Sequence, residues 1–327
     1  MKAMRLEHVG SPLVMRELPD PEPGPLEVRI RVEACAVCRT DLHIVDGDLA
    51  STGHPLTPGH EIVGWVDRLG EGVSALVLGQ RVGVGWLGAA CHACAYCHDG
   101  SENLCDAPTF TGYTRDGGFA THVVADARYV YHLPASGSAA EMAPLLCAGL
   151  IGWRSLGMAG RGGTLGLYGF GAAAHLVLQI AKWEQRRVFA FTRDGDIEAQ
   201  TLARELGADW TGASEQAPPE EMDAAIIYAP VGALVPLALK HVRRGGRVVC
   251  AGIHMSDIPA FPYKDLWGER QIRSVANLTR QDAHAFLALA PSIGLKVRTT
   301  VYPLADANRA LDDLRSGRLH GAAVLTP

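Results

Sequence analysis

The first 135 residues of the chain alternate short apolar stretches with turns that contain glycine or proline. Alternating Val- and Ile-rich segments predict strands at 27–35 (EVRIRVEAC), 62–70 (IVGWVDRLG) and 119–126 (FATHVVAD). This pattern predicts an all-β region.

The pattern changes near residue 137, where helical and strand periods begin to alternate. We expect a helix over 138–159, a strand over 163–171 that enters a glycine turn, and a helix over 172–183. Apolar positions of the last helix fall on one face, at i, i+3, i+4, i+7 and i+8: Ala173, Leu176, Val177, Ile180 and Ala181.

Further units of the same kind follow as far as residue 252. The expected strands are 186–191, 223–229 and 247–252, the expected helices are 197–207 and 232–242, and a turn is expected at 245–246. Apolar strands alternating with helices predict an α/β fold with a parallel, doubly wound sheet. A helix over 304–317 and a strand over 321–327 close the chain.

Length, charge and cysteine content narrow the class of protein. A chain of 327 residues exceeds the usual single core, so two domains are expected. A net charge of -5 without a basic run gives no support for nucleic-acid binding. The sequence shows neither the apolar core of a signal peptide nor an apolar run long enough to span a membrane. We therefore expect a cytoplasmic protein whose eight cysteines serve as thiolates or metal ligands.

Four of these cysteines are closely spaced in CHACAYCHDGSENLC, with the pattern C-x2-C-x2-C-x7-C: Cys91, Cys94, Cys97 and Cys105. Four thiolates at this spacing predict a structural zinc held by one loop. The alternatives are an iron–sulfur cluster or unrelated cysteines, although the polar residues between them are typical of an exposed loop. His92 and His98 are expected to face solvent without binding metal.

A second candidate metal site combines Cys38 of ACAVCRTDLH, His60 of PGHEIVG and Cys147 of APLLCAGLIGW. One histidine and two cysteines are a ligand set of catalytic zinc, with a fourth position open to substrate. A packed core position is the alternative for Cys147. We interpret Cys35 and Cys250 as core residues.

The glycine turn at GFGAAA fits the dinucleotide pattern G-x-G-x-x-G/A, because a strand precedes it and a helix follows. Gly169 permits the tight turn, Gly171 lets the backbone approach a pyrophosphate, and Ala174 allows close helix–strand packing. Ala172 opens the helix whose N-terminus favours phosphate.

The position that binds the cofactor ribose in NAD-dependent proteins is usually acidic. This chain has Thr192 and Arg193 there, which favours the 2′-phosphate of NADP. Asp194 leaves NAD open, because its carboxylate is close enough in sequence to reach the ribose.

The chain resembles the zinc-dependent medium-chain alcohol dehydrogenases over nearly its whole length. The resemblance is carried by six motifs that occur in the order found in that family: CAVCRTDLH, PLTPGHEIVGWV, the four-cysteine loop, DGGFATHVV, LLCAGLIGW and GFGAAA. Within that family the bacterial branch related to cinnamyl alcohol dehydrogenases is the most similar. The resemblance implies a GroES-like catalytic domain (1–136 and 275–327) that holds both zinc sites. It also implies a Rossmann dinucleotide-binding domain (137–274).

The resemblance further implies roles for residues around the second metal site. Cys38, His60 and Cys147 would bind catalytic zinc, which lowers the pKa of a bound alcohol. Glu61 would be a neighbour that approaches the metal transiently. Thr40 would accept the hydrogen bond of the alcohol, and His43 would pass the proton outward.

Asp41 is expected to orient His60 through its second ring nitrogen. A helix N-cap is the alternative, compatible role for Thr40 and Asp41.

By analogy with the family, the nicotinamide end of the cofactor would lie near three apolar residues: Ala229, Ile253 and Leu278. The family's arginine after the last glycine is replaced here by Ala322, so Arg280 is a candidate substitute. The expected substrate wall is apolar: Leu49, Trp86 and Tyr113. A core position is the alternative for Trp86.

We therefore expect an alcohol dehydrogenase, or aldehyde or ketone reductase, with two zinc ions per chain and NAD(H) or NADP(H), the latter favoured. The alternatives are a polyol dehydrogenase, a zinc-free quinone reductase, or a non-catalytic nucleotide-binding protein. We also expect a homodimer or homotetramer that acts on a small molecule, without nucleic-acid or membrane partners.

Overall fold

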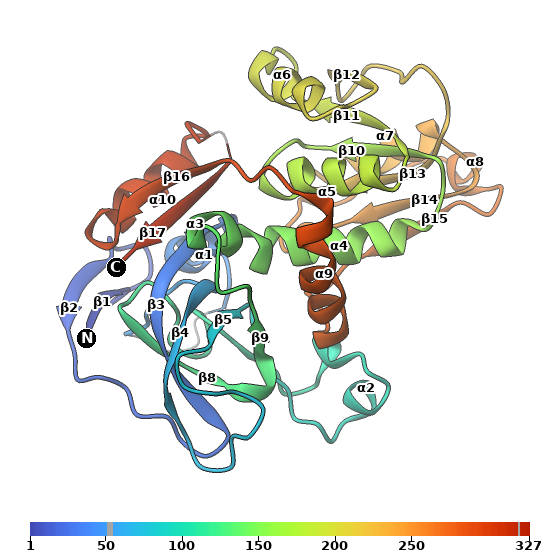
Figure 1. Ribbon diagram of the computed structural model, residues 1–327. Helices are drawn as coiled ribbons and strands as arrows, with labels where there is room; N and C mark the ends of the chain where they lie inside the picture. Colours follow the sequence, from blue (N-terminus) through green and yellow to red (C-terminus); the bar gives the residue numbers. More distant parts are fainter. Residues whose placement is uncertain (51–54, 320) are drawn as a thin grey trace. The chain divides into compact units, whose positions relative to one another are not determined.

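The computed structural model describes residues 1–50, 55–319 and 321–327 (Figure 1). Two compact units make up the chain. Unit 1 comprises Met1–Cys147, Leu278–Leu287 and Val297–Pro327, and unit 2 comprises Ala148–Asn277 and Ala288–Lys296. The mixed α/β fold class is confirmed: the sheet of unit 1 is largely antiparallel, whereas the sheet of unit 2 is parallel.

Unit 1 is built on a sheet with the strand order β16-β17-β3-β4-β5-β9, on which β8 pairs with β3. Its strands are β1 (Lys2–Arg5), β2 (Val14–Glu17), β3 (Glu27–Val37), β4 (Glu61–Leu69), β5 (Arg81–Val84), β6 (Leu87–Ala89), β7 (Thr109–Phe110), β8 (His122–Asp126), β9 (Val130–His132), β16 (Thr299–Pro303) and β17 (Ala322–Thr326). Its helices and 3₁₀ turns are α1 (Arg39–Asp46), α2 (Ala95–His98), η1 (Glu102–Leu104), η2 (Ala127–Tyr129), α3 (Ala139–Met142), η3 (Ala143–Leu146), η4 (Leu304–Asp306) and α10 (Ala307–Arg315). Helix α9 (Arg280–Ile293) begins in unit 1 and ends in unit 2.

Strand β3 fixes the position of the metal-site residues. Val28, Ile30 and Val32 are buried at every second position, as expected for a strand with one face on the core. From residue 34 to 37 both faces are buried, between β4 on one side and β17 on the other. Cys38, the next residue, is therefore attached to a rigid strand end.

Unit 2 has the parallel strand order β12-β11-β10-β13-β14-β15. The strands are β10 (Thr164–Tyr168), β11 (Arg187–Thr192), β12 (Trp210–Ala213), β13 (Met222–Ile227), β14 (Val242–Cys250) and β15 (Gln271–Ser274). The helices are α4 (Ala148–Ala159), α5 (Ala172–Trp183), α6 (Ile197–Glu205), α7 (Leu234–His241) and α8 (Tyr263–Leu266). In chain order this is 3-2-1-4-5-6, the doubly wound arrangement that binds dinucleotides at the carboxyl ends of its strands.

The expected single helix over 138–159 is wrong, because the structure divides it into α3, η3 and α4. Pro144 falls in the first turn of η3, and Cys147 interrupts the helix with φ -132° and ψ -68°. Ala143, before the proline, keeps helical angles (φ -56°, ψ -47°), so the helix is interrupted at Cys147 and not at Pro144. The break leaves Cys147 between two helical segments rather than inside one.

The compact units also differ from the expected domain bounds. Residues 137–147 lie with unit 1, because η3 packs against β3, β4 and β5. Residues 288–296 return to unit 2, where the Gln179 side chain accepts a bond from the Lys296 N–H (2.8 Å) and donates to its carbonyl (3.1 Å).

Three smaller differences concern element ends. The strand expected from residue 119 begins at His122, and the expected tail helix is preceded by the 3₁₀ turn η4. The turn at 245–246 lies inside β14, opposite a register shift in β13, with Gly245 at φ 72°. Among the described residues no single helix meets the length and hydropathy of a membrane span, although the bent pair 139–146 and 148–159 together does.

Candidate active site

The first metal-site residue also starts a helix. Cys38 is the N-cap of α1: its Sγ accepts a bond from the Thr40 N–H at 3.3 Å, and the Asp41 carboxylate accepts from the Cys38 N–H at 2.9 Å. This reciprocal capping box corrects the N-cap role considered for Thr40 and Asp41. The residue that would bind metal is thus held by the helix it caps.

Asp41 and His60 are completely buried and lie side by side. Oδ1 of Asp41 accepts a bond from the Gly59 N–H at 3.2 Å and lies 3.3 Å from Nδ1 of His60. The latter distance suits an ion pair, but His60 Nδ1 has no hydrogen bond of good geometry within the described part of the chain. Nε2 of the same ring faces Cys38 Sγ at 3.2 Å. Asp41 therefore lies beside the ring nitrogen that points away from the thiol, as expected for a residue that orients His60.

The structure brings four possible ligands together: Cys38, His60, Glu61 and Cys147, whose ligand atoms all lie within 4.8 Å of one another. β3 delivers Cys38, β4 begins at Glu61, and the break before α4 places Cys147. Two sulfurs, one imidazole and a carboxylate in a buried site are a donor set that fits Zn²⁺.

The protonation of these groups is set by their mutual proximity and burial. The hydrogen bond from Cys147, and then the charge of His60, hold the pKa of Cys38 well below its usual value. The same bond and burial raise the pKa of Cys147. Burial alone would lower the pKa of His60, but Cys38 and Asp41 raise it above its usual value. Burial raises the pKa of Glu61. These shifts favour a thiolate at Cys38 and disfavour the charged form of Glu61.

The expected proton path lies on α1. Thr40 is half-buried on the first turn, two residues after Cys38, and His43 follows one turn later on the same face. Nδ1 of His43 lies 2.8 Å from Oδ2 of Asp48, which is half exposed. Sequence reasoning missed Asp48. Its only sequence signal is its place directly after Gly47, the residue that ends the helix. The carboxylate therefore holds the His43 ring beside a half-exposed side chain.

The expected substrate wall is an aromatic stack. Trp86 is 8% exposed and meets His60 edge to face, with ring centroids 4.9 Å apart. It stacks on Phe110 at 5.1 Å and on Tyr113 at 5.7 Å. Leu49 is partly buried against the same core. Trp86 is therefore a core residue and a neighbour of the metal site at once. Phe110 was missed, although it stands three residues before Tyr113.

The four-cysteine loop has the geometry of a second metal site. The Sγ atoms of Cys91, Cys94, Cys97 and Cys105 all lie within 4.8 Å of one another. Sulfurs around tetrahedral zinc would be about 3.8 Å apart, and those of Cys91 and Cys97 are 3.9 Å apart. Backbone N–H groups of Ala93 and Cys94 donate to the Cys91 sulfur at 3.4 and 3.3 Å.

Those backbone donors lower the pKa of Cys91 to about 6, whereas burial and neighbouring thiols raise the pKa of Cys97 to about 12. The Cys91 thiolate is therefore available near neutral pH, and metal binding must displace the proton from Cys97.

His98 is exposed as expected, but the expectation for His92 is wrong. His92 is half-buried, and its Nε2 lies 3.3 Å from the hydroxyl of the buried Tyr129. Burial lowers the pKa of His92. Its φ of 56° turns the backbone between Cys91 and Cys94, so the residue shapes the loop.

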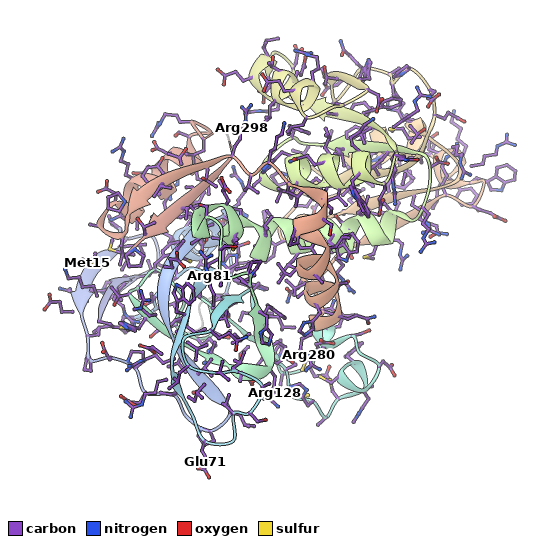
Figure 2. The ribbon with its side chains drawn as sticks, viewed as in Figure 1. Met15, Glu71, Arg81, Arg128, Arg280 and Arg298 are labelled. Carbon is purple, nitrogen blue, oxygen red and sulfur yellow. The ribbon has the colours of Figure 1, made fainter. Side chains whose placement is uncertain are left out.

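Arg280 is bound by the loop and does not stand free for a cofactor phosphate. Its backbone N–H and its Nε donate to Oε1 of the buried Glu102 at 2.8 and 3.2 Å. Its guanidinium lies over the Tyr129 ring, 5.4 Å from the centroid. Figure 2 shows Arg280 at the start of α9, beside the loop. Glu102, which sequence reasoning missed, thus joins the four-cysteine loop to α9.

The glycine turn of unit 2 has the expected local geometry. Gly169 adopts φ 86°, and a Cβ there would lie 2.8 Å from the Ala229 nitrogen, so only glycine fits. Gly171 is the N-cap of α5 and offers no side chain to its first N–H groups. A Cβ on Gly171 would meet nothing within 4 Å, and Ala174 is buried against the sheet. The uncapped helix end with open space above it fits a pyrophosphate.

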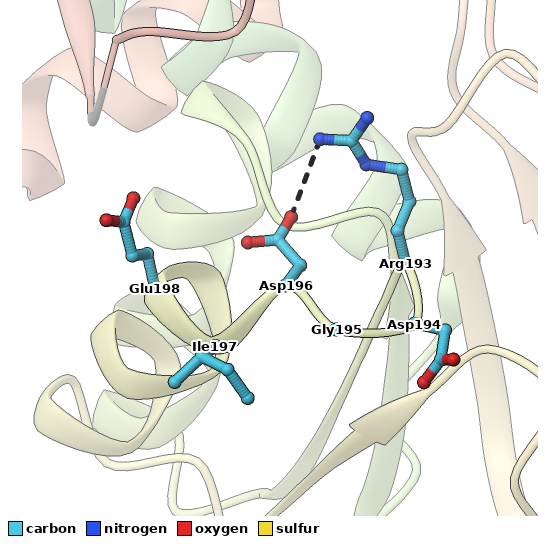
Figure 3. A pocket seen from close by; sticks show the side chains of 6 residues that line it. All are labelled: Arg193, Asp194, Gly195, Asp196, Ile197 and Glu198. Atoms are coloured by element: carbon cyan, nitrogen blue, oxygen red, sulfur yellow. Dashed lines mark ion pairs between the residues drawn. The ribbon is translucent and has the colours of Figure 1, made fainter.

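The two residues expected to distinguish NADP from NAD differ in whether their side chains are free to bind a phosphate. Thr192 is 2% exposed, and its hydroxyl donates to the Arg193 carbonyl at 2.9 Å and accepts from Gln200 at 3.0 Å, so it is engaged internally. Arg193 is 89% exposed and lies 3.8 Å from Asp196 (Figure 3). Residues 193–198 line an open hollow, in which the Asp194 side chain points away from Asp196 (Figure 3). Arg193 is therefore the one remaining candidate of the expected pair for a 2′-phosphate.

The expected nicotinamide-end residues are divided between the two compact units. Ala229 and Ile253 follow β13 and β14 in unit 2, half-buried and 53% exposed respectively. Leu278 is buried at 2% and belongs to unit 1. Of the expected core cysteines, Cys35 is completely buried, whereas Cys250 is half-buried.

Comparisons with known proteins identify the family of the chain. Residues 24–135 match the family described as "Alcohol dehydrogenase GroES-like domain". A protein of Mycobacterium tuberculosis named "Probable alcohol dehydrogenase AdhA" is 47% identical over 313 residues, which cover 93% of this chain and 90% of the relative.

Solved structures share the fold over the whole chain. Cinnamyl alcohol dehydrogenase from Sorghum bicolor superposes with a TM-score of 0.90 at 25% identity, covering 99% of this chain and 97% of that one. Acetophenone reductase from Geotrichum candidum, solved with NAD, gives a TM-score of 0.89 at 28% identity, covering 100% and 97%. The chain therefore belongs to the medium-chain alcohol dehydrogenase family, and it is an alcohol dehydrogenase or reductase.

Proposed function

We propose that the chain interconverts alcohols with aldehydes or ketones, using a zinc ion held by Cys38, His60 and Cys147 and a nicotinamide dinucleotide. The observation that carries the proposal is the buried set of ligand atoms within 4.8 Å of one another, placed by the ends of two strands and by a helix break. Cysteine as third ligand argues against a polyol dehydrogenase, and two complete ligand sets argue against a zinc-free quinone reductase.

When bound, the zinc ion would supply Lewis-acid chemistry that lowers the pKa of a substrate alcohol. The Thr40 hydroxyl, on the first turn of the helix that Cys38 caps, would accept the hydrogen bond of the substrate hydroxyl. His43, held by Asp48, would release the proton to solvent. Asp41 would act as a positioning residue that fixes the His60 ring. Glu61, whose pKa is raised by burial, would be a neighbour able to approach the metal.

The four-cysteine loop would hold a second, structural zinc, so we propose two zinc ions per chain. Its four sulfurs form a closed set with no position left for substrate. Glu102 and Arg280 would then tie the metal-bound loop to α9.

The pyrophosphate of the cofactor would bind at the Gly169–Gly171 turn and the N-terminus of α5. We favour NADP over NAD because an exposed arginine, and not an acidic residue, follows β11 at position 193. Asp194 and the NAD complex of the fungal reductase support the alternative. The homodimer or homotetramer and the cytoplasmic location stay predictions; light scattering after gel filtration measures the former.

Chelation tests the zinc proposal. Reduction of benzaldehyde with NADPH or NADH should disappear after treatment with a strong chelator and return when Zn²⁺ is added, because the metal ligands present an open position. A panel of alcohols and aldehydes run with both cofactors would define the substrate. Undiminished turnover in protein shown to contain no metal would contradict the zinc-dependent reaction.

Replacement of Arg193 tests the choice of cofactor. Arg193→Ala should raise the KM for NADPH about tenfold or more, since a charge-assisted bond to phosphate is lost, and should leave the KM for NADH nearly unchanged. Arg187→Ala is the matched control, because it removes an exposed arginine from the opposite end of the same strand. Equal effects of Arg193→Ala on both cofactors would remove the argument for NADP.

A further inference from the structure

The segment 57–59 leads into His60 and forms neither a helix nor a strand, although Thr57 and His60 are completely buried. The backbone groups of such a segment need partners outside regular secondary structure. The N–H groups of residues 117–119 donate to its three carbonyls at 2.7 to 2.9 Å. The path of the chain into His60 is therefore fixed by the segment 116–119, which starts the motif DGGFATHVV.

Asp116 provides the side-chain part of this contact. Its Oδ1 accepts bonds from the Thr57 N–H at 2.8 Å and from the Arg5 guanidinium at 2.7 Å. The same guanidinium donates to the Thr57 hydroxyl at 2.8 Å and to the Pro55 carbonyl at 2.5 Å. Hydrogen bonds in which one partner is charged are stronger than neutral ones. Asp116 and Arg5 together thus hold Thr57 by its backbone and by its side chain.

The close approach of the two segments requires glycine at position 117. A Cβ on Gly117 would lie 2.1 Å from the Gly59 carbonyl oxygen and 2.7 Å from that of Pro58, so any side chain would push the segments apart. On its other side, the Gly59 N–H donates to Oδ1 of Asp41, the carboxylate beside Nδ1 of His60. The residue before His60 is therefore held between Gly117 and the carboxylate that faces the His60 ring.

We propose that Asp116 is a positioning residue for the metal site, which acts through Thr57 to fix the backbone of His60. This inference rests on the proposed function, because it assumes a zinc ion held by Cys38, His60 and Cys147. Histidine nitrogen and cysteine sulfur bind zinc at nearly fixed distances, so a displaced His60 would hold the ion less tightly. The Asp116 side chain is 50% exposed, and its removal therefore leaves no cavity in the core.

The test measures how fast each zinc ion leaves the holoenzyme. Release to an excess of a chromogenic chelator is followed for the wild-type protein and for Asp116→Ala. Asp116→Ala should release one of its two ions about 10-fold faster, as is usual when a residue that supports a metal ligand is lost, and the other ion at the wild-type rate. Cys38→Ser should hold only the loop ion, so its release curve identifies the loop. Turnover of Asp116→Ala should also fall about tenfold, with the KM for the dinucleotide unchanged.

Two further variants separate positioning from a general loss of stability. Asp116→Asn keeps an oxygen acceptor for the Thr57 N–H and should accelerate release less than Asp116→Ala does. Glu22→Ala breaks another exposed ion pair with an arginine, 2.6 Å from Arg68, and should match the wild-type protein. Faster release of both ions in Asp116→Ala, or release and turnover equal to those of Glu22→Ala, would overturn the role of Asp116. A wild-type protein that holds only the loop zinc would overturn the proposed catalytic zinc site itself.

Discussion

Thr40→Ala is expected to lower the turnover of alcohol oxidation by about 10²–10⁴-fold, the usual contribution of a positioned proton-transfer group. Thr40 is the hydroxyl residue next to Cys38, and its backbone N–H is already bonded to the Cys38 sulfur. The zinc content should not change, because no ligand is altered. Turnover, metal content and melting temperature are measured on the same sample.

The structure makes this test more decisive, because it does not give Thr40 the N-cap role that the sequence allows. An N-cap threonine would cost about 1 kcal/mol of stability on replacement by alanine. The N-cap is Cys38, however, so Thr40→Ala should leave the melting temperature nearly unchanged. Thr40→Ser keeps the hydroxyl and should keep most of the activity. Full turnover in Thr40→Ala would exclude the proton path through this residue.

His43→Ala should do less harm than Thr40→Ala, since water can replace the outer member of a proton path. Added imidazole should partly restore the rate. The contact with Asp48 gives a further control, because Asp48→Asn leaves the histidine in place and removes only the carboxylate charge beside it. A smaller loss in Asp48→Asn than in His43→Ala is expected.

Sequence reasoning reached the residues whose signal is local. The spacing of the four cysteines, the glycine turn between a strand and a helix, and the alternation of β3 all act over a few residues, and the structure shows each in the expected element. Taken one by one, Cys38, His60 and Cys147 carry little signal of a metal site. The order of motifs along the whole chain predicts that they form one site, and the structure brings them together.

Contacts between distant segments could not be predicted in the same way. Glu102 and Arg280 are 178 residues apart, and neither has a local pattern that indicates its partner. The sequence suggested a cofactor contact for Arg280 because the family's arginine is replaced by Ala322. In the structure the buried carboxylate of Glu102 accepts bonds from the backbone N–H and the Nε of Arg280. Thr192 was misjudged for a similar reason: its hydroxyl is bound by Gln200, one helix further along the chain.

The unpaired amide of Asn277 was beyond any sequence pattern. Asparagine is common in turns and accepts left-handed backbone angles, so the sequence favours a turn and nothing more. Only the structure shows that both polar atoms of the side chain are buried without partners among residues 1–50, 55–319 and 321–327. The absence of a bond is a property of the packed surroundings, not of the residue.

Cys94→Ser is expected to remove one zinc ion and to lower the melting temperature by roughly 10 °C or more, because metal bound in a closed site contributes directly to folding. Many residues of the loop are exposed. Apart from a small apolar cluster around Cys105 and Tyr129, it is held by the contacts of Glu102 with Arg280 and of His92 with Tyr129. Elemental analysis should find about two zinc ions in the wild-type chain and about one in the variant.

Cys38→Ser is the matched control, because it removes a thiol from the other metal site. It should also lose about one zinc ion, yet it should lower activity far more and the melting temperature far less, since β3 and α1 hold Cys38 in place from both sides.

The pH dependence of zinc binding is an independent test of the loop. Zinc requires deprotonated thiols, and the pKa of Cys91 is depressed to about 6, so its thiolate is retained as the pH falls from 9 and is lost only below about 6. Zinc release from the loop of the wild-type protein should therefore begin under mildly acidic conditions. Iron in place of zinc in the loop, or identical melting of the two variants, would contradict the division into one structural and one reactive site.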